Sequence, residues 1–383
     1  MKKNEIIFSP LGGGQKVGAS CYYLHFGEHH ILLDAGVDTS KKLMKAPVWS
    51  HLLQAGTLYS MNQIEQIYIS HAHMDHIGFL FGMMNECPRA GVYMTAITKS
   101  LAELQIYDRI YLENIHNNEN KRLAAQSCLD RITLVSYMKT MGFSDYKVTF
   151  YEAGHIPGAM MTLIEYKGRC ILYTGDYSIS ASPLCNGCFI PKDKKIDIVI
   201  LCGLHAKHPE YCKKQDVLFR QISRIFQTVH EKKYSIQCNI SQLSKGVEFL
   251  KLLNQNNLAG IPVFVDEDIM QVAEKMEKNG FQILSKYNKP LSEIESSQPY
   301  ICLVSKHRGN YYCLKQQDID FTLHEDFEEM KQFIKLINPK HVYLVHCASA
   351  LHEGDTTIEQ ILMMDGDCRT QFTFAAEQEI YYI

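Results

Sequence analysis

Apolar residues in the first third of the chain occur in short runs separated by turn-forming residues. The runs at 6–8, 21–25, 31–34 and 66–70 are rich in β-branched and aromatic residues and predict β-strands. The last of these runs leads directly into His71. This part of the chain is therefore expected to form a sheet with polar residues at the strand ends.

The rest of the chain alternates between helical and strand-like spacing. Apolar residues recur at helical spacing over 100–140, over about 215–231, and from Phe327 to Ile337. Further apolar runs predict strands at 147–151, 161–165, 170–173, 197–201 and 341–346. Strands alternating with helices predict an α/β protein.

Length and composition indicate a globular protein of two domains. The chain has 383 residues, of which 46% are hydrophobic and 21% are charged, and its formal net charge is −3. A charge so close to zero does not mark the whole surface for binding a polyanion. Any nucleic-acid site is therefore expected to be a local patch or a metal centre.

Cysteine usage and the N-terminus favour the cytoplasm. The 13 cysteines are an odd number scattered along the chain, as expected for thiols in a reducing compartment. The first residues do not resemble a signal peptide. No apolar run approaches the roughly 18 residues of a membrane span. We therefore expect a cytoplasmic protein without a membrane segment.

The segment from His71 to His76 carries the strongest chemical signal. His71, His73, Asp75 and His76 provide four metal-binding side chains within six residues, at the end of an apolar strand. Imidazoles and a carboxylate so close together would be costly to bury without a cation. The pattern H-x-H-x-D-H therefore predicts a metal site.

Three more distant residues fit the same centre. His155 lies in a glycine-containing turn, Asp176 follows the strand 170–173, and His346 closes the strand 341–346. Each is a metal-ligand type at a strand end or tight turn, where side chains from separate segments can converge. We expect all three to join the His71–His76 cluster.

This set of motifs resembles the metallo-β-lactamase superfamily. The resemblance implies a four-layer αββα sandwich and a dinuclear zinc centre, with manganese or iron as alternatives. It implies one metal on His71, His73 and His155, a second on Asp75, His76 and His346, and Asp176 bridging both. It also implies that Asp34, in the L-L-D-A-G segment, orients a ligand without binding metal.

The last third of the chain is similar to the β-CASP nucleases, the branch with ribonuclease J and the pre-mRNA 3′-end processing endonucleases. The similarity rests on His324 at the start of an amphipathic helix and on His346. It implies a metallo-β-lactamase domain at 1–203, an inserted smaller α/β domain of the β-CASP kind at 204–318, and a return to the first domain at 319–383.

One position departs from the β-CASP pattern. The strand 197–201 would normally lead into an acidic residue that pairs with the helix-start histidine, but Cys202 occupies that position. A cysteine cannot raise the basicity of His324 as a carboxylate would. His205, His208 and Glu210 are alternative partners.

The resemblance predicts a metal-dependent hydrolase that cleaves nucleic acid. Metal-activated hydroxide would attack the phosphodiester, Asp75 would act in the metal centre, and His324 would protonate the leaving oxygen. In this branch a histidine at the position of His346 accompanies RNA substrates, so single-stranded RNA is expected and DNA is disfavoured. Endonuclease and exonuclease modes both stay open, as does a homodimer. The predicted phosphate contacts follow the strand near residue 304: Ser305, Lys306, His307 and Arg308.

Two other functions compete with this prediction. A metallohydrolase of a small-molecule ester or phosphodiester fits the short inserted domain and the near-neutral charge. A non-catalytic scaffold of the β-CASP kind fits the cysteine at 202. Against the scaffold, all seven expected ligand positions hold suitable residues.

Overall fold

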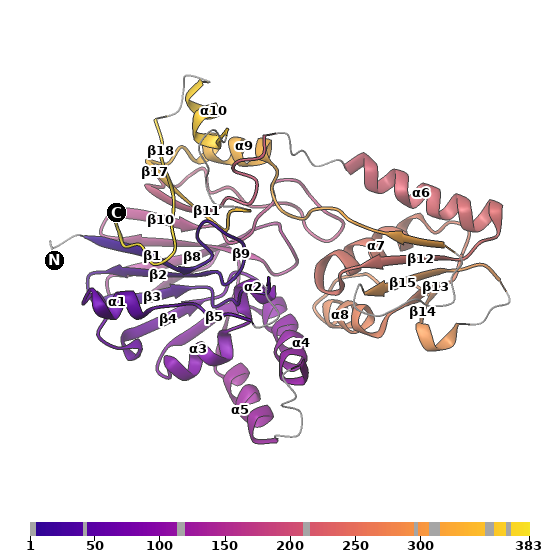
Figure 1. Ribbon diagram of the computed structural model, residues 1–383, viewed down its shortest axis with the longest axis horizontal. Helices are drawn as coiled ribbons and strands as arrows, with labels where there is room; N and C mark the ends of the chain where they lie inside the picture. The colour runs from indigo at the N-terminus through magenta and orange to yellow at the C-terminus, as the bar shows by residue number, and fades with distance from the viewer. Residues whose placement is uncertain are drawn as a thin grey trace. The chain divides into compact units, whose positions relative to one another are not determined.

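The computed structural model describes residues 5–40, 44–112, 119–209, 215–294, 298–305, 315–348, 356–364 and 369–383. The chain divides into two compact units (Figure 1). The first comprises Met1–Ser180, Gly187–Cys212 and His324–Ile383, and the second comprises Ala181–Asn186 and Lys213–Leu323. The inserted domain was predicted at 204–318. In the structure the smaller unit comprises 213–323 together with the short stretch 181–186.

The first sheet of the larger unit is mixed. Its strands β1, β2 and β3 pair antiparallel, and β3 to β6 pair in parallel. In spatial order the strands are β19 (Tyr381–Tyr382), β1 (Ile6–Gly12), β2 (Cys21–Phe26), β3 (His29–Leu33), β4 (Ile64–Tyr68), β5 (Gly91–Thr95) and β6 (Ile132–Val135).

The second sheet also combines both kinds of pairing. Strands β7 to β10 pair antiparallel, and β10, β11, β17 and β18 pair in parallel. Their spatial order is β18 (Gln371–Phe374), β17 (His341–Val345), β11 (Ile198–Cys202), β10 (Arg169–Tyr173), β9 (Met160–Tyr166), β8 (Tyr146–Glu152) and β7 (Thr140–Gly142).

The two sheets face each other across a shared apolar core. On β1, Ile6 and Phe8 point into this core, where the Phe8 and Tyr343 rings meet with centroids 5.2 Å apart, while Ile7 points to the opposite face. Alternation follows from the two-residue period of a strand. Because both faces of the sheet are covered, nearly every residue of β1, β2 and β3 is buried.

Helices cover the outer faces of the sheets. The core on the outer face of the first sheet takes apolar residues from α1 (Ser50–Gln54), α3 (Leu80–Glu86), α4 (Ala96–Leu112) and α5 (Glu119–Asp130). On the second sheet, α9 (Phe327–Ile337) buries Phe333 against the Tyr177 ring at 4.9 Å, and α10 (Ile358–Met364) contacts α9 (Figure 1). The predicted αββα sandwich of an α/β protein is confirmed.

The prediction of helix throughout 100–140 is wrong at its C-terminal end. After α5 the chain forms β6 and then β7. Ile132 and Val135 of β6 are buried, and β6 pairs in parallel with β5 at the edge of the first sheet. β-branched residues favour strands, and here sheet pairing overrides the helical spacing upstream.

The smaller unit is built on a parallel sheet. Its strand order is β14 (Asn288–Pro290), β13 (Val263–Val265), β15 (Ile301–Ser305), β12 (Ile236–Ile240) and β16 (Lys315–Asp318). The helical segments are α6 (Gln215–Lys232), the π-helical turn η2 (Gln242–Gly246), α7 (Val247–Asn256) and α8 (Glu267–Lys278). The stretch 181–186 belongs to this unit because buried Glu248 of α7 accepts hydrogen bonds from Ser182 Oγ (2.7 Å) and the Leu184 amide (3.0 Å).

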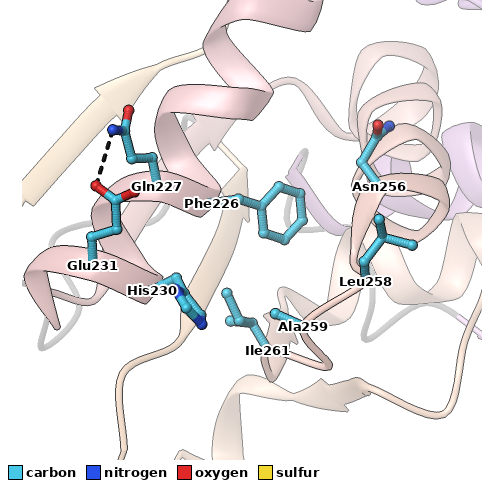
Figure 2. A pocket seen from close by; sticks show the side chains of 8 residues that line it. All are labelled: Phe226, Gln227, His230, Glu231, Asn256, Leu258, Ala259 and Ile261. Carbon is cyan, nitrogen blue, oxygen red and sulfur yellow. Dashed lines mark hydrogen bonds between the residues drawn. The ribbon is translucent and has the colours of Figure 1, made fainter.

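A shallow pocket of about 290 Å³ lies beside α6 in this unit (Figure 2). On its rim Gln227 donates a hydrogen bond to Glu231, and Leu258 is 96% exposed. None of the metal-ligand groups found among the described residues lies there. These groups all belong to the larger unit. No helix within the described ranges is both long and apolar enough to cross a membrane.

Candidate metal centre

Predicted ligands from distant parts of the chain meet at one edge of the sandwich. His71 follows β4, His155 follows β8, Asp176 follows β10 and His346 follows β17. Strands β8, β10 and β17 run in the same direction in the second sheet, so their carboxyl ends share an edge. Short turns beyond that edge can bring these side chains together without long loops.

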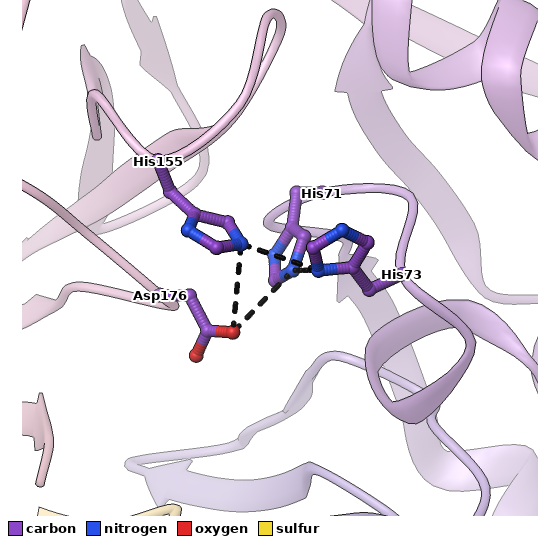
Figure 3. Close-up of side chains that lie close together, drawn as sticks. All are labelled: His71, His73, His155 and Asp176. Atoms are coloured by element: carbon purple, nitrogen blue, oxygen red, sulfur yellow. Dashed lines mark hydrogen bonds and ion pairs between the residues drawn. The ribbon is translucent and has the colours of Figure 1, made fainter. Parts of the chain in front are cut away.

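One group combines three histidines with Asp176 (Figure 3). His71 Nε2 lies 3.1 Å from His73 Nδ1, which lies 3.2 Å from His155 Nε2. Asp176 Oδ2 is 3.6 Å from His71 Nε2 and 3.8 Å from His155 Nε2. Tetrahedral zinc ligands about 2.0–2.1 Å from the metal stand about 3.3 Å apart, so this group fits a zinc-sized ion.

The second group is formed by Asp75, His76 and His346. His346 Nε2 lies 3.8 Å from Asp75 Oδ2, and His76 Nε2 lies 3.3 Å from Asp176 Oδ2. Asp176 Oδ1 is 3.9 Å from His346 Nε2. Asp176 therefore lies between the two groups, where one carboxylate can contact ions on both sides. The structure brings all seven predicted ligands together.

Neighbouring polar residues hold the imidazole rings in one orientation. Asp34 Oδ2 lies 2.7 Å from His76 Nδ1, which leaves His76 Nε2 facing Asp176. Ser20 Oγ lies 3.0 Å from His346 Nδ1, and Ser70 Oγ lies 3.0 Å from His71 Nδ1. In each case a residue outside the ligand set contacts the nitrogen that faces away from the centre. Such contacts fix the ring tautomer and its direction.

Asp34 is itself held by several donors. The Ser70 amide (2.6 Å), the Ser70 hydroxyl (2.7 Å) and the Tyr173 hydroxyl (2.5 Å) all donate to its carboxylate. The family resemblance predicted an orienting role for Asp34, but the contacts of Tyr173, Ser70 and Ser20 were not predicted. These residues lie within or beside apolar strands, so their spacing alone does not distinguish them from core residues.

The backbone around the cluster is tightly constrained. Asp34 and His346 have positive φ angles of 63° and 53°, which non-glycine residues rarely adopt and which often occur at functional sites. Gly36 packs so closely on the turn α2 (Met74–Ile77) that a Cβ there would come within 1.7 Å of the Asp75 carbonyl oxygen. Only glycine allows this contact, which fixes the turn carrying Asp75 and His76.

Burial and neighbouring charges shift the pKa values of the cluster in opposite directions. Burial lowers the pKa of His71 well below its ordinary value of 6.5, and His76 lowers it further. Burial also lowers the pKa of His76, but Asp176 and Asp34 raise it more, so that it lies well above 6.5. Burial raises the pKa of Asp176, yet His346, His76 and His324 bring it well below its ordinary value. The cluster therefore combines an ionised carboxylate with imidazoles of unequal pKa, and a bound cation would compete with the proton on His76.

His324 lies beside this cluster, before α9. Its Nδ1 is 3.7 Å from Asp176 Oδ2, and its ring is tilted against the His155 ring at 4.4 Å. Its side chain is 20% exposed, so solvent or a substrate can reach it. Burial of the ring nitrogens lowers the pKa of His324 well below 6.5, although Asp176 opposes this shift.

Cys202 and Glu325 complete the surroundings of His324. Cys202, Asp176 and His324 present ligand atoms that all lie within 4.8 Å of one another. Burial raises the pKa of the Cys202 thiol well above 9.0, and Glu325 and Asp176 raise it further. Glu325 is buried, and its amide donates to the Tyr177 carbonyl oxygen at 2.8 Å. Glu325 was not predicted as part of the site, although it is adjacent to His324 in the sequence.

The predicted phosphate contacts are less well defined. Ser305 is buried, and its hydroxyl and amide both donate to Asp266 Oδ2 at 3.2 Å. Ser305 therefore fixes the end of β15 in this structure, and a substrate contact from it stays a prediction. Lys306, His307 and Arg308 lie outside the described residues, as does Glu210.

Comparison with known proteins agrees with this geometry. Residues 23–200 match the model of the metallo-β-lactamase superfamily domain. The chain carries a metallo-β-lactamase domain. That domain holds His71, His73, Asp75, His76, His155 and Asp176, whereas His324 and His346 lie beyond the matched residues.

The curated relatives are RNA-processing proteins by name. The chain is 29% identical over 232 residues to the endoribonuclease ysh1 of Emericella nidulans, covering 58% of this chain and 26% of that protein. It is 30% identical over 202 residues to cleavage and polyadenylation specificity factor 73 of Drosophila melanogaster, covering 52% and 28%. It is 26% identical over 311 residues to a protein of Methanocaldococcus jannaschii named "Probable RNase MJ4", covering 78% and 68%.

These similarities agree with the β-CASP resemblance seen in the sequence. The chain spans about a quarter of the length of the fungal relative. A crystal structure of an Enterococcus faecalis V583 protein of unknown function shares the fold, with a TM-score of 0.63 and 13% identity, over 99% of this chain and 100% of that one.

Proposed function

We propose that the protein is a dinuclear zinc phosphodiesterase that cleaves RNA. The observation that carries this proposal is the convergence of seven ligand side chains, with Asp176 between the two groups and His324 Nδ1 3.7 Å from its carboxylate. A metal centre next to an accessible imidazole can both bind a phosphodiester and move a proton. The names of the curated relatives support RNA as the substrate.

We assign the ligands as two sets that share Asp176. His71, His73 and His155 would hold one ion, and Asp75, His76 and His346 would hold the other. Zinc bound in such sites lowers the pKa of a coordinated water toward neutrality and neutralises charge on phosphate oxygens. Asp34, Ser20 and Ser70 keep the ring nitrogens of His76, His346 and His71 directed at the centre.

His324 would act on the leaving group. Its side chain is 20% exposed, and its Nδ1 lies 3.7 Å from Asp176 Oδ2. An anionic phosphodiester next to the ring favours the imidazolium form, which offsets the effect of burial on the pKa of His324. The protonated ring can then donate to the leaving oxygen, as general acids do within hydrogen-bond reach.

The substrate would be single-stranded RNA, and the protein would be cytoplasmic. Cleavage within the RNA chain is favoured because the relatives in Emericella nidulans and other fungi are named endoribonucleases. Within the described ranges no two cysteines form a disulfide, which fits a reducing compartment.

The test compares substrates on one preparation. Zinc-loaded protein is incubated with single-stranded RNA, DNA of the same sequence, a thioester and a cyclic phosphodiester, and the products are sized and their ends identified. We expect cleavage of RNA with 5′-phosphate ends. The double variant His73→Ala, Asp75→Ala should lose both bound zinc and cleavage.

A matched control uses another His–Asp pair. His29 Nε2 contacts Asp145 Oδ1 at 2.6 Å, at the opposite end of β3 from Asp34. The double variant His29→Ala, Asp145→Ala should keep both metal and activity. Turnover of small esters without RNA cleavage would replace this proposal with a small-molecule hydrolase. Bound zinc without any turnover would favour a scaffold.

A further inference from the structure

Cys202 faces the metal centre from the end of β11, where the β-CASP pattern has an acidic residue. Its side chain is 1% exposed, and its sulfur lies beside the Asp176 carboxylate. The Cys202 sulfur, a carboxylate oxygen of Asp176 and a ring nitrogen of His324 all lie within 4.8 Å of one another. These three residues form a third group with metal-ligand geometry. Cys202 and His324 are not among the seven assigned ligands, whereas Asp176 is.

The donor set of this group differs from those of the other two. The groups around His71 and His76 offer nitrogen and oxygen only, whereas Cys202 adds sulfur. Soft thiolate ligands select thiophilic ions, while hard oxygen ligands suit magnesium or manganese. Replacement of the thiol proton by a cation converts Cys202 into a thiolate ligand. Glu325 is also buried, and it lies close enough to Cys202 to act on it electrostatically.

We propose that Cys202, His324 and Asp176 form a third cation site that takes thiophilic divalent ions such as cadmium or excess zinc. Two cations already bound on either side of Asp176 would repel a third, so this site binds more weakly than the first two. An ion held there occupies a ring nitrogen of His324. On the basis of the proposed function, that occupation blocks proton transfer to the leaving oxygen and inhibits RNA cleavage.

The binding test does not depend on activity. Full-length protein loaded with two equivalents of zinc is titrated with cadmium chloride, and bound metal is counted by mass spectrometry after desalting. The ultraviolet charge-transfer band of a cadmium–thiolate bond reports the sulfur contact. We expect one further equivalent with this band in the unaltered protein, its loss in Cys202→Ser, and at least tenfold weaker binding in His324→Gln.

Cys170 provides the control for adventitious thiol binding, because it is a partly exposed cysteine on β10. Cys170→Ser should keep the third equivalent and its band. The proposal would be overturned if Cys202→Ser kept the band and the third equivalent. It would also be overturned if Cys170→Ser lost both to the same extent as Cys202→Ser. Circular dichroism of each variant checks folding, and His324→Gln provides an independent second variant.

Inhibition separates this inference from the proposed function. Cadmium should slow RNA cleavage by the unaltered protein at least tenfold, and it should slow Cys202→Ser much less relative to that variant's own rate. A cadmium–thiolate band that depends on Cys202, in a protein that cleaves no RNA, would refute the proposed function and leave the third site intact. RNA cleavage by a protein that shows no such band would refute the third site and leave the proposed function intact.

Discussion

Asp34 Oδ2 lies 2.7 Å from His76 Nδ1, and both residues are almost fully buried. Three donors, from Ser70 and Tyr173, hold the Asp34 carboxylate in place. Asp34 therefore determines which nitrogen of His76 faces the metal centre.

We expect Asp34→Asn to weaken metal binding on the side of His76. The amide group of asparagine would face the donors from Ser70 and Tyr173, and the negative charge that stabilises the His76 ring would be lost. Loss of such an orienting contact typically reduces metal affinity about 10- to 100-fold. Zinc competition with a chromophoric chelator measures the change. Asp145→Asn, at an exposed carboxylate, should leave the affinity unaltered.

His324→Gln should slow RNA cleavage without removing the two zinc ions. Glutamine keeps a hydrogen-bonding side chain but cannot carry the proton, and loss of a general acid costs roughly 10²- to 10⁴-fold in rate. Single-turnover kinetics and metal analysis together test this. His230→Gln, at an exposed histidine of α6, is the comparison. Loss of zinc from His324→Gln would show that His324 supports the metal centre itself.

Removal of metal should lower thermal stability. Without cations, the Asp176 carboxylate and the surrounding imidazoles stay buried with incompletely balanced charge. Ions that bind the folded state at 1,000 times Kd contribute about 4 kcal/mol per site, so chelation should lower Tm on the order of 10 °C. Calorimetry with and without chelator gives the value. The double variant His73→Ala, Asp75→Ala should show little further decrease on chelation.

The smaller unit should be destabilised as pH rises toward neutrality. Burial raises the pKa of Glu248 to about 7, while Ser182 and the Leu184 amide oppose the shift. The folded state then holds a proton that the unfolded state releases near pH 4.5. The resulting contribution to the free energy of unfolding, about 3 kcal/mol, is full below about pH 4.5 and is lost as pH rises through about 7.

Glu248→Gln removes this titrating group and should flatten the dependence between pH 4.5 and 7. Urea unfolding at several pH values measures it. Glu274→Gln, at an exposed position of α8, should reproduce the slope of the unaltered protein. An equally steep slope in Glu248→Gln would mean that another group is responsible.

Gly36→Ala should disturb the turn that carries Asp75 and His76. Its Cβ would overlap the Asp75 carbonyl oxygen, so the turn must move. Overpacking of this kind costs about 1–3 kcal/mol or more, and we expect a lower zinc content as well. Gly142→Ala is a matched control, because nothing lies within 4 Å of a Cβ at that position. Unchanged metal content in Gly36→Ala would show that the turn can adapt.

Much of the fold and of the candidate site was predictable because two kinds of pattern coincide. Strands β4, β10 and β17 end at residues 68, 173 and 345, and His71, Asp176 and His346 follow within three residues. A ligand-type side chain shortly after an apolar run is informative because strand ends converge at a sheet edge.

Other features depend on tertiary contacts that no local pattern contains. The strand β6 is defined by pairing with β5, and the stretch 181–186 joins the smaller unit through Glu248 of α7. Tyr173 acts on Asp34, 139 positions away along the chain. Nothing in the local sequence of these segments indicates the distant residues that they contact.

The order of these segments along the polypeptide determines when the ligand cluster is completed during translation. His71 to Asp176 are synthesised well before His324 and His346, because the smaller unit comes between them. A nascent or prematurely terminated product therefore has an incomplete cluster and lacks the imidazole at 324. On the proposed function, RNA cleavage therefore requires that β17 has been translated and has paired in the second sheet.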